Sequence, residues 1–286
     1  MSEIVIVANP DKPEAMRLAE SVQQHLSTQG KAHYLSLGFD EDLSHREAGM
    51  VVVFGGDGTV LGAVQRFNGV APPILAFNVG RLGYLAGNPP NRIMEMIDDA
   101  LAGQLSSSLR MMLEVKITES DGRRWRVLAL NEVVLSSSRP GRMIPLAVKV
   151  DGEDVMFSRG DGIIISTPTG STAYALSAGG PVASPTLDAM ILAPLCPHQL
   201  ANRPLVLGPD EKIHLGRFGG QEVSLTVDGT RNHLVGSGAA IEACKAEHRI
   251  CLLSPPRGKF TTLREKLGWG WGEEKAASRE SARFRR

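Results

Sequence analysis

The stretch VVVFGGDGTVL, residues 51–61, constrains the fold of this chain more than any other part of the sequence. Four β-branched or aromatic residues in succession predict a short buried strand. The strand ends at a turn with three glycines, and Val60, Leu61, Val64 and Phe67 then follow with the spacing of one helix face. Residues 51–61 therefore predict a strand, a tight turn and a helix start, which is the repeating unit of parallel α/β sheets.

The turn at residues 55–59, GGDGT, has features of a phosphate site. Glycines bring backbone N–H groups close to a ligand, and a helix N-terminus adds partial positive charge. The candidate phosphate ligands are Gly55, Gly56, Gly58 and Thr59. Asp57 would repel a phosphate, so we expect it to accept a proton, to hold Mg²⁺, or both, unless it only stabilises the turn or caps the helix.

Residues 1–108 show the alternation of strands and helices that is typical of a Rossmann-like parallel α/β domain. Strands are predicted at residues 3–9, 32–37 and 72–78, and helices at residues 12–29 and 91–103. A second glycine-rich loop, residues 79–85, follows the strand at 72–78. Because ligands of such sheets bind at the carboxyl ends of the strands, both glycine loops should face the same crevice.

The hydrophobic pattern changes near residue 109, and residues 109–260 predict a β-rich, β-sandwich-like domain. Strands are predicted at residues 111–118, 124–130, 132–136, 162–166, 204–207, 212–216, 222–227, 239–243 and 249–253, with a hairpin at 148–155 and another turning at Asp121 and Gly122. At most one or two helices are predicted in this part, around residues 172–179 and 186–193. Residues 261–286 should pack back onto the protein and end in a flexible basic tail.

Composition excludes several classes of partner. Lys plus Arg and Asp plus Glu both number 31, so no net charge draws the chain to nucleic acid or to a membrane surface. No apolar run reaches the length of a membrane span. Cys196, Cys244 and Cys251 lack the spacing of a zinc site, and we interpret them as buried thiols of a cytoplasmic protein.

Two further segments are rich in polar residues beside apolar strands. Residues 159–181, RGDGIIISTPTGSTAYALSAGGP, combine a strand with a loop of hydroxyl groups that suits sugars, phosphates and base edges, unless it is only a capped turn. Tyr174 offers a stacking face. Asn131 and Glu132 lie between two apolar runs and either point outward or bind a polyol or an amide. The Walker motif and the G-x-G-x-x-G fingerprint are both missing, so nucleotides would be held by another device.

Together these segments resemble the NAD kinase family. The resemblance rests on residues 55–59, the pair Asn131 and Glu132, and residues 161–181, in this order and spacing. It continues through residues 77–85, 193–198, 203–206, 262–263 and 267–269, and covers residues 3 to 270. The glycine turn alone is shared with diacylglycerol and sphingosine kinases, whereas the combination is specific.

The resemblance implies transfer of the γ-phosphoryl group of ATP, or of a phosphoryl group of inorganic polyphosphate, to the 2′-hydroxyl of the adenosine ribose of NAD. It also implies Mg²⁺ or another divalent metal ion and a homodimer or homotetramer. Asp57 would accept the proton, Thr172 to Ser177 would form the adenosine pocket, and His198 either lines the pocket or is structural. The implied NAD-binding residues are Asp57, Gly58, Asn131, Glu132, Arg142, Arg159, Asp161, Thr172, Ala173, Tyr174, Ala175, Leu176, Ser177, Asp228 and Thr230.

Two other functions are compatible with the glycine turn. A lipid or sphingoid kinase would need an apolar acceptor groove, whereas the candidate acceptor residues here are polar. A non-catalytic NADP-binding sensor would bind nucleotide without turnover, and only the intact Asp57 argues against it. An assay for NADP formation from NAD, ATP and Mg²⁺ separates the three.

Overall fold

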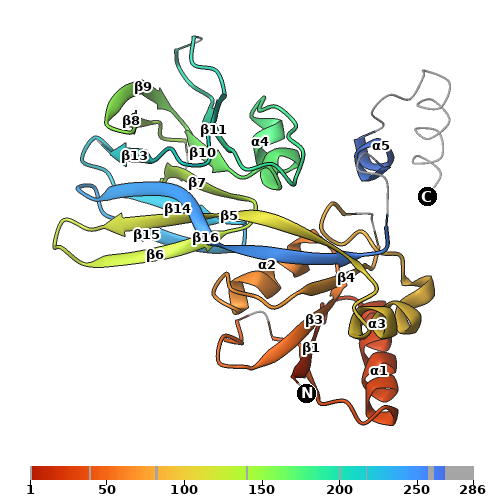
Figure 1. Cartoon of the computed structure of the whole chain (residues 1–286). Coiled ribbons are helices and arrows are strands. Elements are labelled where there is room, and N and C mark those ends of the chain that lie inside the picture. Colours follow the sequence, from red (N-terminus) through yellow and green to blue (C-terminus); the bar gives the residue numbers. More distant parts are fainter. Residues whose placement is uncertain are drawn as a thin grey trace.

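A computed structural model describes residues 2–38, 40–80, 83–139, 141–199, 201–216, 218–256 and 261–267. Within these residues the chain forms a ten-stranded and a six-stranded sheet (Figure 1). The larger sheet contains β1 (Glu3–Ala8), β2 (His33–Ser36), β3 (Ala48–Gly55), β4 (Ile74–Asn78), β5 (Ser106–Thr118), β6 (Arg124–Ala129), β8 (Ile144–Val150), β9 (Glu153–Gly160), β13 (Ile213–Gly216) and β16 (Ala240–Ser254). The smaller sheet contains β7 (Glu132–Ser137), β10 (Gly162–Ser166), β11 (Met190–Leu195), β12 (Leu205–Leu207), β14 (Val223–Val227) and β15 (Arg231–Val235). The helices are α1 (Pro13–Thr28), α2 (Asp57–Arg66), α3 (Ile93–Leu101), α4 (Tyr174–Ser177) and α5 (Thr261–Leu267), with short 3₁₀ turns η1 (Pro90–Arg92) and η2 (Gly170–Thr172).

The N-terminal part is a parallel sheet covered by helices on both faces. Strands β2, β1, β3 and β4 lie side by side in this order and run parallel. Ile4 and Ile6 of β1 face the core formed with α1 and α3, whereas Val5 and Val7 face the core formed with α2. Strands buried on both faces require nearly continuous apolar runs, which is why residues 3–8 and 50–54 lack polar alternation.

Two long strands, β5 and β16, connect this parallel sheet to the β-rich part. They pair antiparallel along nearly their whole length. Near its end, β16 also pairs in parallel with β4, through Leu252 and Leu253 opposite Ile74 and Leu75. Figure 1 shows both strands running from the β-rich part into the parallel sheet. The predicted boundary at residue 108 falls inside β5.

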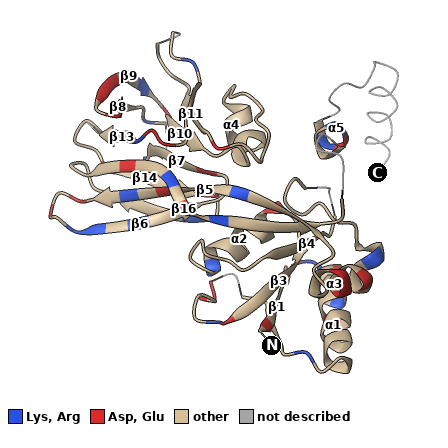
Figure 2. Ribbon diagram, in the orientation of Figure 1, with Lys and Arg blue, Asp and Glu red and all other residues tan. Residues whose placement is uncertain are grey.

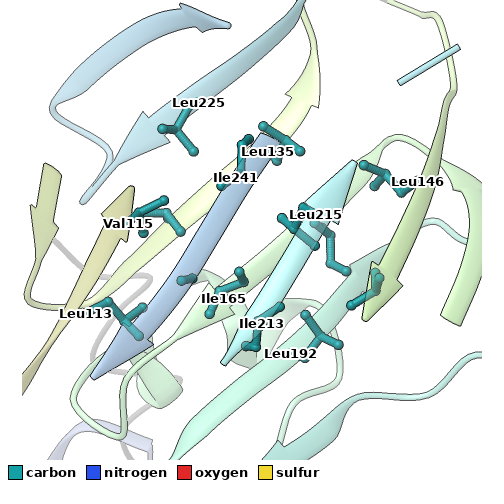
Figure 3. Close-up of a cluster of buried hydrophobic side chains, with 14 of the residues drawn as sticks. Leu113, Val115, Leu135, Leu146, Ile165, Leu192, Ile213, Leu215, Leu225 and Ile241 are labelled. Carbon is teal, nitrogen blue, oxygen red and sulfur yellow. The ribbon is translucent and has the colours of Figure 1, made fainter. Parts of the chain in front are cut away.

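The β-rich part is a sandwich whose two sheets enclose one apolar core. The larger sheet contributes residues of β5, β8, β13 and β16, and the smaller sheet contributes residues of β7, β10, β11 and β14. Figure 3 shows side chains from both sheets meeting, for example Leu113 and Ile241 with Leu135 and Ile165. The predicted fold class, a parallel α/β domain followed by a β-sandwich-like domain, is confirmed.

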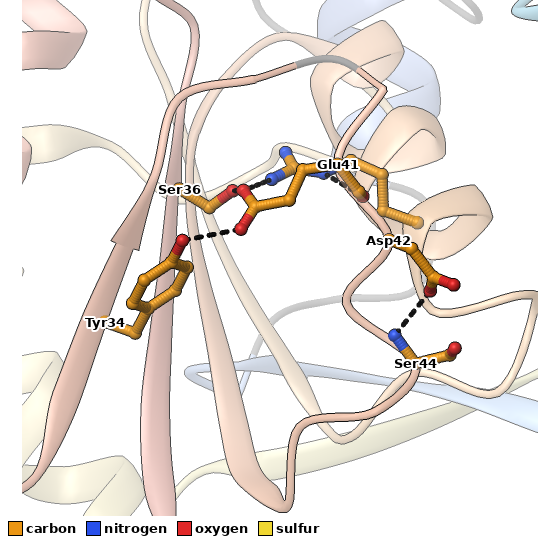
Figure 4. A network of polar contacts seen from close by, with 6 residues as sticks. Tyr34, Ser36, Glu41, Asp42 and Ser44 are labelled. Atoms are coloured by element: carbon orange, nitrogen blue, oxygen red, sulfur yellow. Dashed lines mark hydrogen bonds and ion pairs between the residues drawn. The ribbon is translucent and has the colours of Figure 1, made fainter.

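The C-terminal end of α2 is fixed to the parallel sheet by a polar network around Glu41 (Figure 4). The hydroxyl group of Tyr34 donates to Glu41 Oε1 at 2.6 Å, and Ser36 donates to Oε2. Arg66 is only 3% exposed, and its Nη2 lies 3.1 Å from Glu41 Oε2. A buried guanidinium needs such a partner, so this ion pair holds α2 in place.

Several predicted elements need correction. The helix predicted at residues 186–193 is wrong, because residues 190–195 form β11, a buried strand between β10 and β12. A short apolar run fits a buried strand and a buried helix equally well, and here the neighbouring strands decide. The helix predicted at 172–179 is reduced to η2 and α4. The two strands predicted at 239–243 and 249–253 are parts of the single strand β16, and the polar strand β15 was not predicted.

The interpretation of the cysteines as buried thiols is wrong for Cys196, which is exposed, and Cys244 and Cys251 are only partly buried. Cys196 directly follows β11 and has a φ of 44°, in the left-handed region. All three are free.

Positive and negative residues are interspersed over both parts of the molecule (Figure 2). Among the described helices, none combines the length and the hydropathy that crossing a membrane requires. The C-terminal segment is described only as α5, and the predicted basic tail at residues 273–286 lies outside the described residues.

Candidate active site

The glycine turn lies where the sequence predicts it, between β3 and α2. Gly55 ends β3, Gly56 precedes the helix, and Asp57 is its first residue. A Cβ atom on Gly55 would lie 2.1 Å from Thr59 Oγ1, so only glycine lets the strand turn this closely onto the helix. Gly58 has open space around its Cα. The N–H group of Thr59 already donates to the carbonyl oxygen of Gly56 at 3.0 Å. Helix geometry gives the N–H groups of Asp57 and Gly58 no acceptor within α2, which leaves them available to an anion.

The carboxylate of Asp57 binds the second glycine-rich loop. Its Oδ2 accepts a hydrogen bond from the N–H group of Tyr84 at 2.8 Å, and its Oδ1 accepts from Leu85 at 2.9 Å and Ala86 at 3.0 Å. Lys266 of α5 adds an ion pair, with its Nζ 3.2 Å from Oδ2. Burial opposes the charged form, but the three N–H groups and Lys266 outweigh it and lower the pKa of Asp57. Asp57 is therefore ionised and fixed in orientation at neutral pH.

The second glycine-rich loop is shaped to accept this contact. A Cβ atom on Gly83 would lie 1.9 Å from Asp57 Oδ1, so a larger residue would displace the carboxylate. Asn78 ends β4 directly before the loop, and β4 pairs with β3. Both loops thus leave the same edge of the parallel sheet and meet at Asp57, as the sequence predicts.

Two lysines beside the turn were not identified from the sequence. The Nζ of Lys12, which precedes α1, donates to the carbonyl oxygen of Val79 at 2.6 Å. It lies 4.0 Å from the position of a Cβ on Gly56 and 3.5 Å from that of a Cβ on Gly80. The sequence could have identified Lys12, because this lysine follows the first strand at the same edge of the crevice. No sequence feature points to Lys266, which lies 209 residues from Asp57 in the chain.

A second polar cluster forms around Asp228, in the turn between β14 and β15. Its Oδ1 accepts from the N–H groups of Asn131 at 2.7 Å and Glu132 at 3.2 Å. Its Oδ2 accepts from the N–H group of Leu130 at 3.0 Å and from Nε2 of Gln65 at 2.9 Å. Asp228 is 4% exposed, so both oxygens face the protein and hold the backbone of residues 130–132.

Three buried polar atoms near this cluster lack a hydrogen-bond partner among the described residues. They are Oδ1 of Asn131, Oε2 of Glu132 and Oγ1 of Thr169. Burial and the nearby charge of Asp228 raise the pKa of Glu132 to about 8, so Glu132 is mainly protonated at neutral pH. Burial also raises the pKa of Asp228. Because a buried polar atom without a partner is destabilising by roughly 1–3 kcal/mol, these atoms fit a ligand that would bond to them.

The hydroxyl-rich loop after β10 packs against the same residues. The N–H group of Thr167 donates to the carbonyl oxygen of Asn131 at 2.8 Å, and its hydroxyl group donates to that of Leu130 at 2.6 Å. A Cβ on Gly170 would lie 2.3 Å from the same Asn131 oxygen. The structure therefore brings together the Asn131–Glu132 pair, Asp228 and the loop that leads into η2 and α4.

The remaining predicted site residues lie in three places. The first place is η2 and α4, which carry or adjoin Thr172, Ala173, Tyr174, Leu176 and Ser177. Tyr174 is 48% exposed, whereas the side chain of Ala175 is fully buried in a small core. Arg159 and Asp161 flank Gly160 at the junction of β9 and β10, where their backbone bonds His198 and Leu195. The thiol group of Cys196 also hydrogen-bonds Asp161, which raises the pKa of Cys196. Arg142 lies in the connection between β7 and β8, and Thr230 lies in the turn that contains Asp228.

Helix α2 connects the two polar centres. Asp57 begins the helix and Gln65, near its end, donates to Asp228, so the two carboxylates lie at opposite ends of α2. Eight residues of α-helix span about 12 Å. This arrangement is a candidate extended site, with the glycine turn at one end of α2 and, among the described residues, buried polar atoms without a hydrogen-bond partner beyond the other end.

Comparison with known proteins identifies the family of this chain. Residues 36–105 match the family ATP-NAD kinase N-terminal domain, and residues 130–253 match the ATP-NAD kinase C-terminal domain. The fold and these two domains define a phosphotransferase. Among curated relatives, the NAD kinase of Syntrophotalea carbinolica is 35% identical over 283 residues, which cover 94% of this chain and 99% of the relative. The NAD kinase of Thiobacillus denitrificans is 38% identical over 225 residues, or 78% of each protein.

Solved structures show the same likeness. Yeast NADH kinase in complex with NADH has a TM-score of 0.82 and 26% identity, covering 95% of this chain and 89% of the yeast chain. The NAD kinase from Archaeoglobus fulgidus in complex with ATP has a TM-score of 0.73 and 28% identity, covering 94% of this chain and 98% of that chain. This chain belongs to the NAD kinase family, and the resemblance found in the sequence is confirmed.

Proposed function

We propose that this chain transfers a phosphoryl group from ATP, or from inorganic polyphosphate, to the 2′-hydroxyl of the adenosine ribose of NAD, which makes NADP. The observation that carries the proposal is an ionised Asp57 fixed inside a glycine-rich turn, in a chain of the NAD kinase family. Relatives named NAD kinase support the reaction, the archaeal complex with ATP supports the donor, and the yeast complex with NADH supports a dinucleotide acceptor.

Asp57 acts mainly by positioning the acceptor hydroxyl. Its lowered pKa makes it a weak base, but phosphoryl transfer has a loose transition state in which the proton can leave late. A carboxylate has about four acceptor sites, and Asp57 already accepts four contacts. The 2′-hydroxyl would therefore replace one donor, and Lys266 is the only one of the four that belongs to a side chain. Lys266 would then be free to face the transferred phosphoryl group.

Asn131 and Glu132 hold NAD through their unsatisfied side-chain atoms. A protonated Glu132 can donate as well as accept, which suits a ribose hydroxyl. Thr172 and residues 173–177 supply the adenosine pocket, where Tyr174 has an exposed ring to stack on the adenine. Arg142, Arg159, Asp161 and Thr230 make further contacts with the dinucleotide, and Asp228 contributes by holding residues 130–132.

A divalent metal ion enters with the donor. Within the described residues, no group of three or more His, Cys, Asp or Glu side chains is arranged to hold a metal ion. Asp57 could contribute one oxygen, but both of its oxygens accept hydrogen bonds. We infer that Mg²⁺ or another divalent ion is bound by the donor phosphates and belongs to the substrate. We also infer a cytoplasmic enzyme that works as a homodimer or homotetramer.

The proposed reaction is tested by incubating the purified protein with NAD, ATP and Mg²⁺ and by measuring NADP with an NADP-specific dehydrogenase. Polyphosphate replaces ATP in a parallel reaction. Formation of NADP with either donor supports the proposal. Nucleotide binding without turnover would indicate a sensor, and the proposal is wrong if neither donor yields NADP.

The role of Asp57 is tested by the substitution Asp57→Asn, which keeps the shape of the side chain but removes its charge. We expect kcat to fall roughly 100-fold or more, with the Kd for NAD within a few-fold of the original value. Asp154→Asn is the control, because Asp154 is 81% exposed on the β8–β9 hairpin. Comparable turnover in Asp57→Asn would remove Asp57 from the chemistry.

A further inference from the structure

Lys12 is a cation beside the catalytic turn that neither the family resemblance nor the proposed reaction assigns to a ligand. Its backbone is fixed by the parallel sheet, because Lys12 N–H donates to the carbonyl oxygen of Asn9 at 3.1 Å and Asn9 N–H donates to that of Phe54 at 3.1 Å. Phe54 belongs to β3, which leads directly into the glycine turn. Lys12 is therefore anchored to the strand that carries the turn.

The ammonium group of Lys12 lies between the two glycine-rich loops. Its Nζ lies 4.0 Å from the position of a Cβ on Gly56 and 3.5 Å from that of a Cβ on Gly80, whose φ is +110°. Neither glycine has a side chain that would separate Nζ from an incoming group. An anion that approaches the N–H groups of the turn would therefore meet this ammonium group.

The charge of Lys12 has no acidic partner in the part of the chain that the structure describes. No carboxylate oxygen of the described residues lies within 4.0 Å of Nζ, and its one described acceptor is the carbonyl oxygen of Val79 at 2.6 Å. An ammonium group has three donors, so two remain for a ligand. Lys12 is partly buried, and such a charge is stabilised when an anion binds beside it. In contrast, Lys266 is neutralised by Asp57.

We propose that Lys12 binds the polyphosphate chain of the phosphoryl donor. The inference rests on the proposed function and extends it to a residue that binds the phosphoryl donor and does not bind NAD. Lys12 contacts phosphate oxygens of the donor, while Asp57 and Lys266 face the transferred group. The same ammonium group serves ATP and inorganic polyphosphate, because a point charge recognises the phosphate chain and not the nucleoside.

The test compares Lys12→Met with Lys12→Arg and with the control Lys116→Met. Lys116 is a suitable control because its Nζ pairs with Glu114 at 3.2 Å on the β-sandwich and is 51% exposed. We expect Lys12→Met to raise the KM for ATP roughly tenfold or more, because it removes a charge-assisted contact to phosphate. The KM for NAD should change less than about twofold, Lys12→Arg should recover part of the loss, and the control should match the original protein.

Calorimetric titration with inorganic tripolyphosphate, in the absence of NAD, gives a second readout that does not need turnover. Weaker binding to Lys12→Met than to Lys116→Met, with similar melting temperatures, supports the inference. If Lys12→Met does not fold, Lys12→Gln replaces it. An unchanged KM for ATP, or a larger change in the KM for NAD, would overturn the role of Lys12. Absence of NADP formation by the unmodified protein would instead contradict the proposed function and leave the tripolyphosphate titration as the test of Lys12.

Discussion

Gln65 of α2 joins the two halves of the site, and the substitution Gln65→Leu tests how much this contact contributes. Its side-chain amide donates one hydrogen bond to the carbonyl oxygen of Leu128 at 2.8 Å and another to Oδ2 of Asp228 at 2.9 Å. Gln65 is 5% exposed and Asp228 is 4% exposed, so water cannot replace the lost donor. Leucine keeps a similar size but donates neither bond.

The magnitude follows from these two bonds. A hydrogen bond to a charged group is worth about 1.5–3 kcal/mol and one between neutral groups about 0.5–1.5 kcal/mol. We therefore expect Gln65→Leu to lower the free energy of unfolding by about 2–4 kcal/mol. Loss of the donor should also raise the pKa of Asp228 further above its ordinary value, because Gln65 favours the charged form. The variant then binds more protons in the folded state, so its deficit should shrink as the pH falls.

The assay is urea-induced unfolding at several pH values, with Gln29→Leu as the control. Gln29 makes the same type of contact at the same distance, since its Nε2 donates to Asp98 Oδ1 at 2.9 Å. Asp98, however, has a side chain that is 46% exposed, so water replaces the lost amide. The control should lose about 0.5 kcal/mol or less.

Activity gives an independent check on Gln65→Leu. Because Asp228 holds residues 130–132, the KM for NAD should rise more than the KM for ATP at temperatures well below unfolding. Equal losses of stability in Gln65→Leu and Gln29→Leu would refute the argument from burial. Equal rises in both KM values would refute the argument that α2 positions the NAD-binding residues.

Two further predictions concern single residues of the site. The pKa of Glu132 rises from 4.5 to about 8 on folding, so the folded protein holds a proton there that the unfolded chain has lost, and Glu132 should lower stability progressively as the pH rises through this range. In thermal unfolding, Glu132→Gln should therefore be more stable than the original protein at pH 8 and equally stable near pH 4. Gly55→Ala should lower both the melting temperature and kcat, because its Cβ would lie 2.1 Å from Thr59 Oγ1. Gly62→Ala in α2 is the control and should be neutral or stabilising, since its Cβ meets nothing within 4 Å. A destabilised Glu132→Gln at pH 8, or a tolerated Gly55→Ala, would contradict these accounts.

The sequence predicted the structure correctly where a segment's conformation depends on residues adjacent to it in the chain. The strand, turn and helix at residues 51–66 follow from a local pattern of β-branched residues, glycines and helical spacing. The hairpin turns near Asp121 and Asp151 also follow from local preferences, and both are confirmed by the strand pairing. The helix predicted at residues 186–193 failed because its apolar run carries no periodicity that distinguishes a helix from a buried strand.

The sequence by itself determined the fold class, the two glycine-rich loops at one edge of the parallel sheet, and the family. Only the tertiary structure decided what surrounds Asp57 and what Asp228 does. Lys266 and Asp57 are 209 residues apart, and Gln65 and Asp228 are 163 apart. No local pattern encodes such contacts, because they arise when β16 joins the parallel sheet and α2 meets the β14–β15 turn. From the sequence, Asp57 could be a base, a metal ligand or a helix cap. The tertiary contacts keep its carboxylate ionised and fixed in orientation.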